Sequence, residues 1–184
     1  PDVFMTDLFT PIIVRLEELS GKKYQDDTRA MRIIGDHLKA AVMMMADGVV
    51  PSNKMQGYVL RRLIRRAMLY GRNLGFDAWG ELVEPVVTIY SEAYPEVPKN
   101  VNRIRQLLSE EALRFGRMLK RGLREIEKVT MIDGKTAFFL YESYGFPWEM
   151  TQEIAQGKGQ HIDRVDFEAE FKKHQELSRT AAKG

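Results

Sequence analysis

The sequence contains no cysteine at any of its 184 positions. Disulfides, thiolate zinc sites and a cysteine nucleophile are therefore excluded, and the cytoplasm is the expected compartment. Histidine is scarce, and His37, His161 and His174 never fall three or four residues apart, the spacing that would place two imidazoles on one helix face. We therefore expect no metal site.

Long apolar runs are missing as well. No stretch approaches the roughly 20 apolar residues that a membrane helix needs, and no charged-then-apolar leader stands at the start, so we expect no membrane partner. The sequence also lacks a Walker-type glycine loop, a G-x-S-x-G motif and a nucleophile beside a base. We therefore predict no catalytic residue in this chain.

The residues that are present follow helical periodicity almost everywhere. Apolar side chains make up 44% of the sequence, enough for a packed core, and they recur three and four residues apart. This pattern predicts an all-α fold, a helical bundle of about six to eight helices. The expected helices span about residues 7–19, 26–48, 56–74, 79–90, 99–128 and 136–144, with a last one from 163 onward.

We predict one helical domain over residues 1–184, with a linker helix in about 1–25, a main bundle in about 26–130 and a C-terminal helical part in about 131–184. Thr136 is expected to cap the helix that follows the Asp-Gly turn. The apolar face of the last helix is expected to consist of Val165, Phe167, Phe171 and Leu177. Because the chain starts without Met and its last five residues carry no helix stop, we expect a piece of a longer protein.

Positive charge gathers in one segment, although the net charge is only +2. Between Gly48 and Phe76 there is no Asp or Glu, and the basic residues there are Lys54, Arg61, Arg62, Arg65, Arg66 and Arg72. A rotation of about 100° per residue separates an apolar side of the helix over 56–74 from a side that carries Arg61, Arg62, Arg65 and Arg66.

We expect this exposed arginine face to bind phosphates, because guanidinium offers a forked set of donors and keeps its charge. Tyr58 and Tyr70 flank the arginines and are candidates for stacking on bases or sugars. The alternative is a solvated face, or arginines paired with acids elsewhere in the fold, such as Glu110 and Glu111.

Four ordered blocks of the sequence closely resemble alanyl-tRNA synthetases. They are RIIGDHLKA at residues 32–40, DGVVPSN at 47–53, GYVLRRLIRRA at 57–67 and TAFFLYESYGFP at 136–147. The opening TDLFTPII at residues 6–13 is similar to the part that follows the family's catalytic domain. The resemblance therefore covers nearly the whole chain.

The resemblance implies a role in recognising tRNA. In this family the class II core, with ATP, Mg and alanine, precedes this region, and the zinc-containing editing domain follows it. The segment itself is then implied to hold the acceptor stem of tRNA(Ala), which the family identifies by a G:U wobble pair at the third position. We accordingly expect part of an alanine–tRNA ligase without activity or cofactor of its own, and with two partners, the acceptor stem and the parent's catalytic domain.

The family's two base-reading residues can be carried over to this sequence. Asn53 matches the Asn of the Pro-Ser-Asn loop, which reads the wobble pair from the minor groove. The second reader is an Asp two residues before the Tyr of Tyr-Gly-Phe-Pro, and this chain has Glu142 there. Glu142 keeps the carboxylate but adds about 1 Å of reach. The alternatives without RNA contact are a helix cap for Asn53 and an ordinary surface acid for Glu142.

Two other functions stay open at this point. One is a free-standing helical RNA-binding protein derived from the synthetase. The other is a structural docking domain whose arginines meet an acidic protein surface. An uninterrupted reading frame that encodes the class II motifs upstream would favour a fragment over a free-standing protein. The docking domain predicts no preference for a folded acceptor stem.

Overall fold

The computed structural model describes residues 2–181, with side chains as far as residue 177. Over these residues the secondary structure consists of α-helices and short 3-10 helices without any strand, so the predicted all-α fold is confirmed. The chain divides into two compact units, the first ending at Arg114 and the second beginning at Phe115. The domain plan predicted from the sequence, with its linker, main bundle and C-terminal part, stays a prediction.

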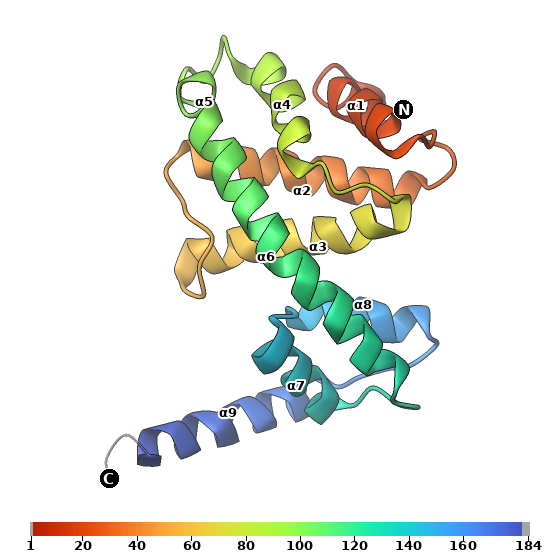
Figure 1. Cartoon of the computed structure of the whole chain (residues 1–184), viewed down its shortest axis with the longest axis vertical. Coiled ribbons are helices and arrows are strands. Elements are labelled where there is room, and N and C mark those ends of the chain that lie inside the picture. Colours follow the sequence, from red (N-terminus) through yellow and green to blue (C-terminus); the bar gives the residue numbers. More distant parts are fainter. Residues whose placement is uncertain (1, 182–184) are drawn as a thin grey trace. The chain divides into compact units, whose positions relative to one another are not determined.

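The first unit is built around two long neighbouring helices, α2 (Thr28–Ala46) and α3 (Met55–Leu74). Figure 1 shows them side by side and antiparallel, joined by the loop over residues 47–54. The other elements of this unit are η1 (Val3–Met5), α1 (Thr10–Ser20), η2 (Trp79–Leu82), α4 (Val83–Tyr90), α5 (Glu96–Lys99) and the start of α6 (Val101–Glu127).

Local sequence signals fix where these helices begin and end. The Asp27 carboxylate accepts a hydrogen bond from Ala30 N at 3.0 Å and caps α2, as an acidic residue at that position should. Gly75 ends α3 in the left-handed conformation at φ 83°, which costs glycine little. The apolar stripes that result are fully buried, and they include Ile12, Leu16, Ile34, Leu38, Leu60 and Ile64.

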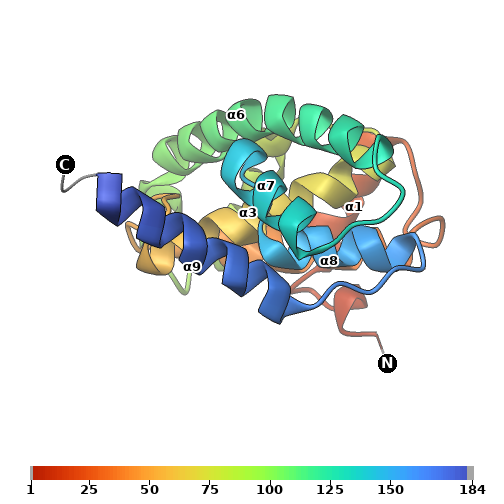
Figure 2. The same ribbon diagram turned by 90° about the horizontal axis from the view of Figure 1, so that it is seen from below.

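The second unit contains the rest of α6 with α7 (Gly134–Tyr144), α8 (Trp148–Gly157) and α9 (Arg164–Ala181). Helix α9 lies along α7, as Figure 2 shows. A cluster of aromatic rings joins these two helices, with Phe138 6.2 Å from both Phe167 and Phe171 between ring centroids. On α6, a Cβ at Gly122 would lie 2.5 Å from the Phe146 ring, so only glycine lets that ring pack there.

The second unit differs from the sequence-based expectations in three respects. Helix α8 was not predicted, because Pro147 both ends the preceding segment and stands as N-cap of a new helix. The cap of α7 is Asp133, whose Oδ1 accepts hydrogen bonds from Thr136 N and Thr136 Oγ1, both at 2.7 Å. Val165 and Leu177 are 68% and 64% exposed, so they do not form a buried face of α9. We also expected no helix stop in the last five residues of the chain. Three of these, residues 182–184, lie outside the described residues, so this expectation stays a prediction.

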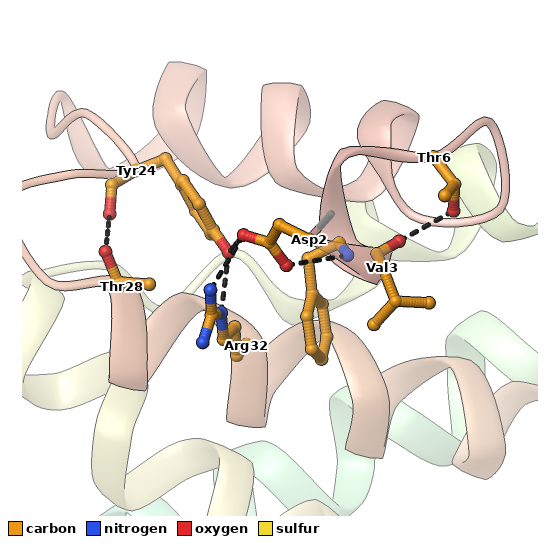
Figure 3. Close-up of polar contacts among 7 residues, drawn as sticks. Asp2, Val3, Thr6, Tyr24, Thr28 and Arg32 are labelled. Atoms are coloured by element: carbon orange, nitrogen blue, oxygen red, sulfur yellow. Dashed lines mark hydrogen bonds and ion pairs between the residues drawn. The ribbon is translucent and has the colours of Figure 1, made fainter.

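The start of the chain is fastened to α2 by Asp2 (Figure 3). Tyr24 Oη and Arg32 Nη2 each donate to Asp2 Oδ2 at 2.7 Å, and Arg32 Nε donates to Tyr24 Oη at 2.7 Å. The hydrogen bond from Tyr24, followed by that from Arg32, lowers the pKa of Asp2 to about 2.

The helices formed by the described residues include none with the length and hydrophobicity that a membrane span requires.

Candidate nucleic-acid interface

The Pro-Ser-Asn loop is fastened to the first turn of α3. Ser52 N donates to Gly57 O at 3.0 Å. The Ser52 hydroxyl donates to Lys54 O at 3.1 Å and accepts from Lys54 N at 3.3 Å. A Cβ at Gly57 would lie 2.1 Å from Ser52 Oγ and 2.6 Å from Val50 O, so the loop packs against a position that only glycine can occupy. The loop is therefore held in one place relative to α3.

Asn53 stands exposed on this loop, and its side chain is held by Arg61. Arg61 Nη1 donates to Asn53 Oδ1 at 2.5 Å, and Arg61 Nη2 donates to Pro51 O at 3.2 Å. Lys54, rather than Asn53, is the N-cap residue of α3, and no side chain makes a capping hydrogen bond there. The cap alternative for Asn53 is therefore wrong, and its side chain is available for another role.

Two of the four clustered arginines are drawn into the fold. Arg61 Nε lies 3.1 Å and Arg65 Nε 2.9 Å from Oε1 of Glu111, a carboxylate on α6 that is only 3% exposed. The side chains of Arg61 and Arg65 are 13% and 12% exposed, and burial lowers the pKa of the Arg65 guanidinium. The expectation of a fully exposed arginine face is wrong for these two residues, and the alternative of pairing with Glu111 is confirmed for them. Their predicted contact with phosphate stays a prediction.

The other two arginines, Arg62 and Arg66, are half-buried. Arg66 Nη1 lies 2.7 Å from His37 Nε2, and its guanidinium carbon lies 5.8 Å from the centre of the Tyr70 ring. Because arginine only donates, this contact makes His37 Nε2 the acceptor and leaves its proton on Nδ1, 3.0 Å from Asp36 Oδ2. Arg62 also has an interaction partner in the fold. None of the four arginines is a bare cation on a solvated face.

The residues next to Asn53 form the most exposed part of the basic segment. Lys54, Met55 and Gln56 are exposed, and Met55 is 82% exposed at a φ of 47°. This is the left-handed region, in which a side chain other than that of glycine costs free energy. Tyr58, one turn into α3, is half-buried and also has an interaction partner. The loop end that carries Asn53 therefore has a strained backbone at Met55 and an exposed lysine, Lys54.

Glu142 belongs to the second unit, whereas Asn53 belongs to the first. Its Oε1 lies 3.1 Å from Nδ1 of His174 on α9, and both side chains are about half exposed, at 45% and 49%. The His174 ring also packs 5.5 Å from the Phe138 ring between centroids. Glu142 is therefore more than an isolated surface acid. Sequence reasoning missed His174 as its partner, because the two residues lie on different helices.

No group of three or more His, Asp or Glu side chains in the described residues is arranged to hold a metal ion.

Comparison with known proteins matches this chain to one family. The family model for class II (A) tRNA synthetases matches residues 1–184. An alanine–tRNA ligase from Borrelia garinii subsp. bavariensis is 45% identical over 96% of this chain, and one from Borreliella afzelii is 46% identical over 96%. One from Thermotoga maritima is 41% identical over 97%.

The chain spans 32% of the length of the two Borrelia-type relatives and 22% of the Thermotoga relative. The match runs through both units, including the anchored Pro-Ser-Asn loop and the helix that carries Glu142. This chain belongs to the class II (A) family of tRNA synthetases and is similar throughout to one segment of alanine–tRNA ligases.

Proposed function

We propose that this chain is the segment of an alanine–tRNA ligase that recognises the acceptor stem of tRNA(Ala) through its G:U wobble pair. The observation that carries this proposal is the presentation of Asn53. Its amide stands exposed on a loop fastened to α3 by the Ser52–Gly57 hydrogen bond and by Arg61. Because the chain is similar to alanine–tRNA ligases along 96% of its length, we expect the partner of Asn53 to be tRNA(Ala).

The minor groove of an RNA helix suits such a reader. It is wide and shallow in A-form RNA, so a loop can approach the base edges there, whereas the major groove is too narrow. The groove shows acceptors on every base pair, and guanine adds one amino donor. An amide can donate and accept, and a carboxylate can only accept, so Asn53 suits either kind of group and Glu142 suits the guanine amino group.

Phosphate contacts supply the affinity. Lys54 is exposed beside Asn53, and no ion pair is seen for its ammonium group among the described residues. Arg62, Arg66 and Tyr58 line the half-buried sides of the same helix. Contacts of this kind fix the position of the RNA and carry no sequence information, because the phosphates are the same at every base pair.

In the intact ligase this segment would present the tRNA to the catalytic domain of the same chain. There the alanine carboxylate attacks the α-phosphate of ATP, which forms alanyl adenylate and releases pyrophosphate. The alanyl group then passes to the 3′ end of the tRNA, and AMP leaves. No residue of this segment is proposed to take part in either step, and the segment alone is expected to bind RNA without activating alanine.

Two variants of the base readers test the proposal. Asn53→Ala and Glu142→Ala are each expected to weaken binding of a G:U acceptor-stem minihelix by about 1 to 3 kcal/mol, and to leave binding of the matched G:C minihelix nearly unchanged. Isothermal titration of both minihelices measures the four affinities. An equal loss for the two minihelices would show that neither side chain reads the base pair.

A further inference from the structure

All three guanidinium nitrogens of Arg61 lie against groups of the protein, two of them through hydrogen bonds and Nε through an ion pair. Its Nη1 donates to Asn53 Oδ1 at 2.5 Å, its Nη2 donates to Pro51 O at 3.2 Å, and its Nε lies 3.1 Å from Glu111 Oε1. The three nitrogens thus face three groups of the protein itself. With 13% of the side chain exposed, Arg61 would have to leave these groups to reach an RNA backbone.

We propose that Arg61 is a positioning residue that sets the orientation of the Asn53 amide, and that it does not bind phosphate. The inference rests on the proposed function, because it concerns how Asn53 meets the base pair. It corrects the reading of α3 as a helix whose four arginines act alike. Arg61 orients the Asn53 side chain, and the neighbouring cations supply the affinity for RNA.

The chemistry of the contact fixes which end of the amide points outward. Arginine carries only donors, so the amide atom that faces Arg61 must be the carbonyl oxygen. The Nδ2 group of Asn53 therefore points away from Arg61, and no partner for it is seen among the described residues. Asn53 then offers two N–H donors to its ligand, together with the second lone pair of Oδ1.

This orientation determines which groups of the base pair Asn53 can contact. Donors meet the acceptors of the minor groove, which are the N3 of purines and the O2 of pyrimidines. A wobble pair displaces the pyrimidine toward the major groove and changes where its O2 lies relative to the purine. A fixed donor senses this displacement, whereas a freely rotating amide would adapt to both G:U and G:C.

The buried carboxylate of Glu111 completes the arrangement. It faces both Arg61 and Arg65 on successive turns of α3, and at 3% exposure it has little water to share its charge with. A buried charge without its partners is costly, so Glu111 keeps the two guanidinium groups in place. Glu111 on α6 thus holds Arg61, and Arg61 in turn holds Asn53. All three residues belong to the first unit.

Substitution of Arg61 separates positioning from phosphate binding. Arg61→Lys keeps the positive charge, but a single ammonium group cannot face Glu111, Asn53 and Pro51 O in the geometry of the guanidinium fork. We expect this variant to lose most of the preference for a G:U over a G:C minihelix, a change of at least fivefold in the affinity ratio. The slope of log affinity against log salt should stay that of the unsubstituted chain.

Lys54→Met is the matched control, since Lys54 is exposed one residue from Asn53 and has a single cation to lose. We expect it to weaken both minihelices alike and to reduce the salt slope by about 1, with the G:U preference kept. Arg61→Met removes the charge and should likewise lose the G:U preference while keeping the salt slope. If it instead weakens both minihelices alike, reduces the salt slope by about 1 and keeps the G:U preference, Arg61 binds phosphate and the inference is overturned. Circular dichroism checks that each variant keeps its helix content.

A measurement without RNA keeps the inference separate from the proposed function. The side-chain amide of Asn53 should give a heteronuclear NOE close to that of the α3 backbone, because Arg61 holds it. In Arg61→Lys and in Glu111→Gln this NOE should fall to the value of a mobile side chain. An Asn53 amide that is already mobile in the unsubstituted chain would overturn the positioning role, whatever the minihelices show. A rigid Asn53 amide with no preference for G:U would instead refute the proposed function.

Discussion

Gly57→Ala is the substitution that most directly tests how the Pro-Ser-Asn loop is held. The new Cβ would lie 2.1 Å from Ser52 Oγ, 2.9 Å from Ser52 Cβ and 2.6 Å from Val50 O. Rotation of the Ser52 side chain can relieve the first of these contacts. The other two involve the loop's Cβ and backbone, so the loop itself must move away from α3.

The expected magnitude follows from three opposing terms. Crowding of a packed position costs about 1 to 3 kcal/mol, and loss of the Ser52–Gly57 hydrogen bond costs about 1 kcal/mol more. Replacing a helical glycine by alanine returns about 1 kcal/mol of helix propensity. We therefore expect Gly57→Ala to lower the free energy of unfolding by about 1 to 3 kcal/mol, and to weaken G:U discrimination because Asn53 moves with the loop.

Gly35→Ala provides the matched control in the same unit. Gly35 is also a buried helical glycine, but a Cβ there would meet its nearest neighbour, Ile13 Cδ1, at an ordinary 3.6 Å. This substitution should raise the free energy of unfolding by up to about 1 kcal/mol, through propensity alone. Urea unfolding followed by circular dichroism measures both variants. If Gly57→Ala is as stable as Gly35→Ala, the loop is not held as described.

Three further predictions concern single side chains. Met55→Gly should stabilise the first unit by roughly 0.5 to 1 kcal/mol in the same urea assay, because relief of the strain at φ 47° outweighs the entropy cost of glycine, and equal stability would argue against the strain. The Asp2 pKa of about 2 is below its ordinary 3.8, so the stability that Asp2 adds over Asp2→Asn should be fully present above pH 3.8 and disappear as the pH falls through 2; a difference between the two proteins that is constant across this range in acid unfolding would refute it. His174→Ala should tighten binding of a G:U minihelix by up to about fivefold, since it frees the Glu142 carboxylate from its half-exposed contact with His174, and weaker binding would show that His174 supports the contact instead.

The helical pattern could be predicted from the sequence because its signals are local. Gly75 ends α3 and Asp27 begins α2, and the buried positions of α3 follow the 3.6-residue period. Helix α8 escaped prediction for an equally local reason. Pro147 reads as a break, although a proline is also a favoured start for a short helix.

The state of the arginines could not be predicted, because it depends on a partner far away in the sequence. Glu111 follows Arg65 by 46 positions and lies on another helix. Periodicity places Arg61 and Arg65 on the side of α3 opposite to its apolar residues, but it does not say that α6 covers part of that side. A charge cluster without a local acid can therefore be partly neutralised by the fold.

The candidate site was found by two different kinds of signal. Asn53 and Glu142 rest on the resemblance of whole sequence blocks, since a single Asn or Glu has no pattern of its own. The structure adds the side chains that hold them, Arg61 for Asn53 and His174 for Glu142. Neither pairing has a signature in the sequence, because each joins residues from separate elements.

The central claim is that this chain reads the third base pair of the acceptor stem of tRNA(Ala). Its most direct test is a titration of the 184-residue chain with two minihelices that differ only in that pair, G:U against G:C, over a series of salt concentrations. We predict tighter binding of the G:U minihelix by about 1 to 3 kcal/mol at every salt concentration, with parallel salt slopes for the two. Equal affinities for the two minihelices throughout the series would contradict the claim.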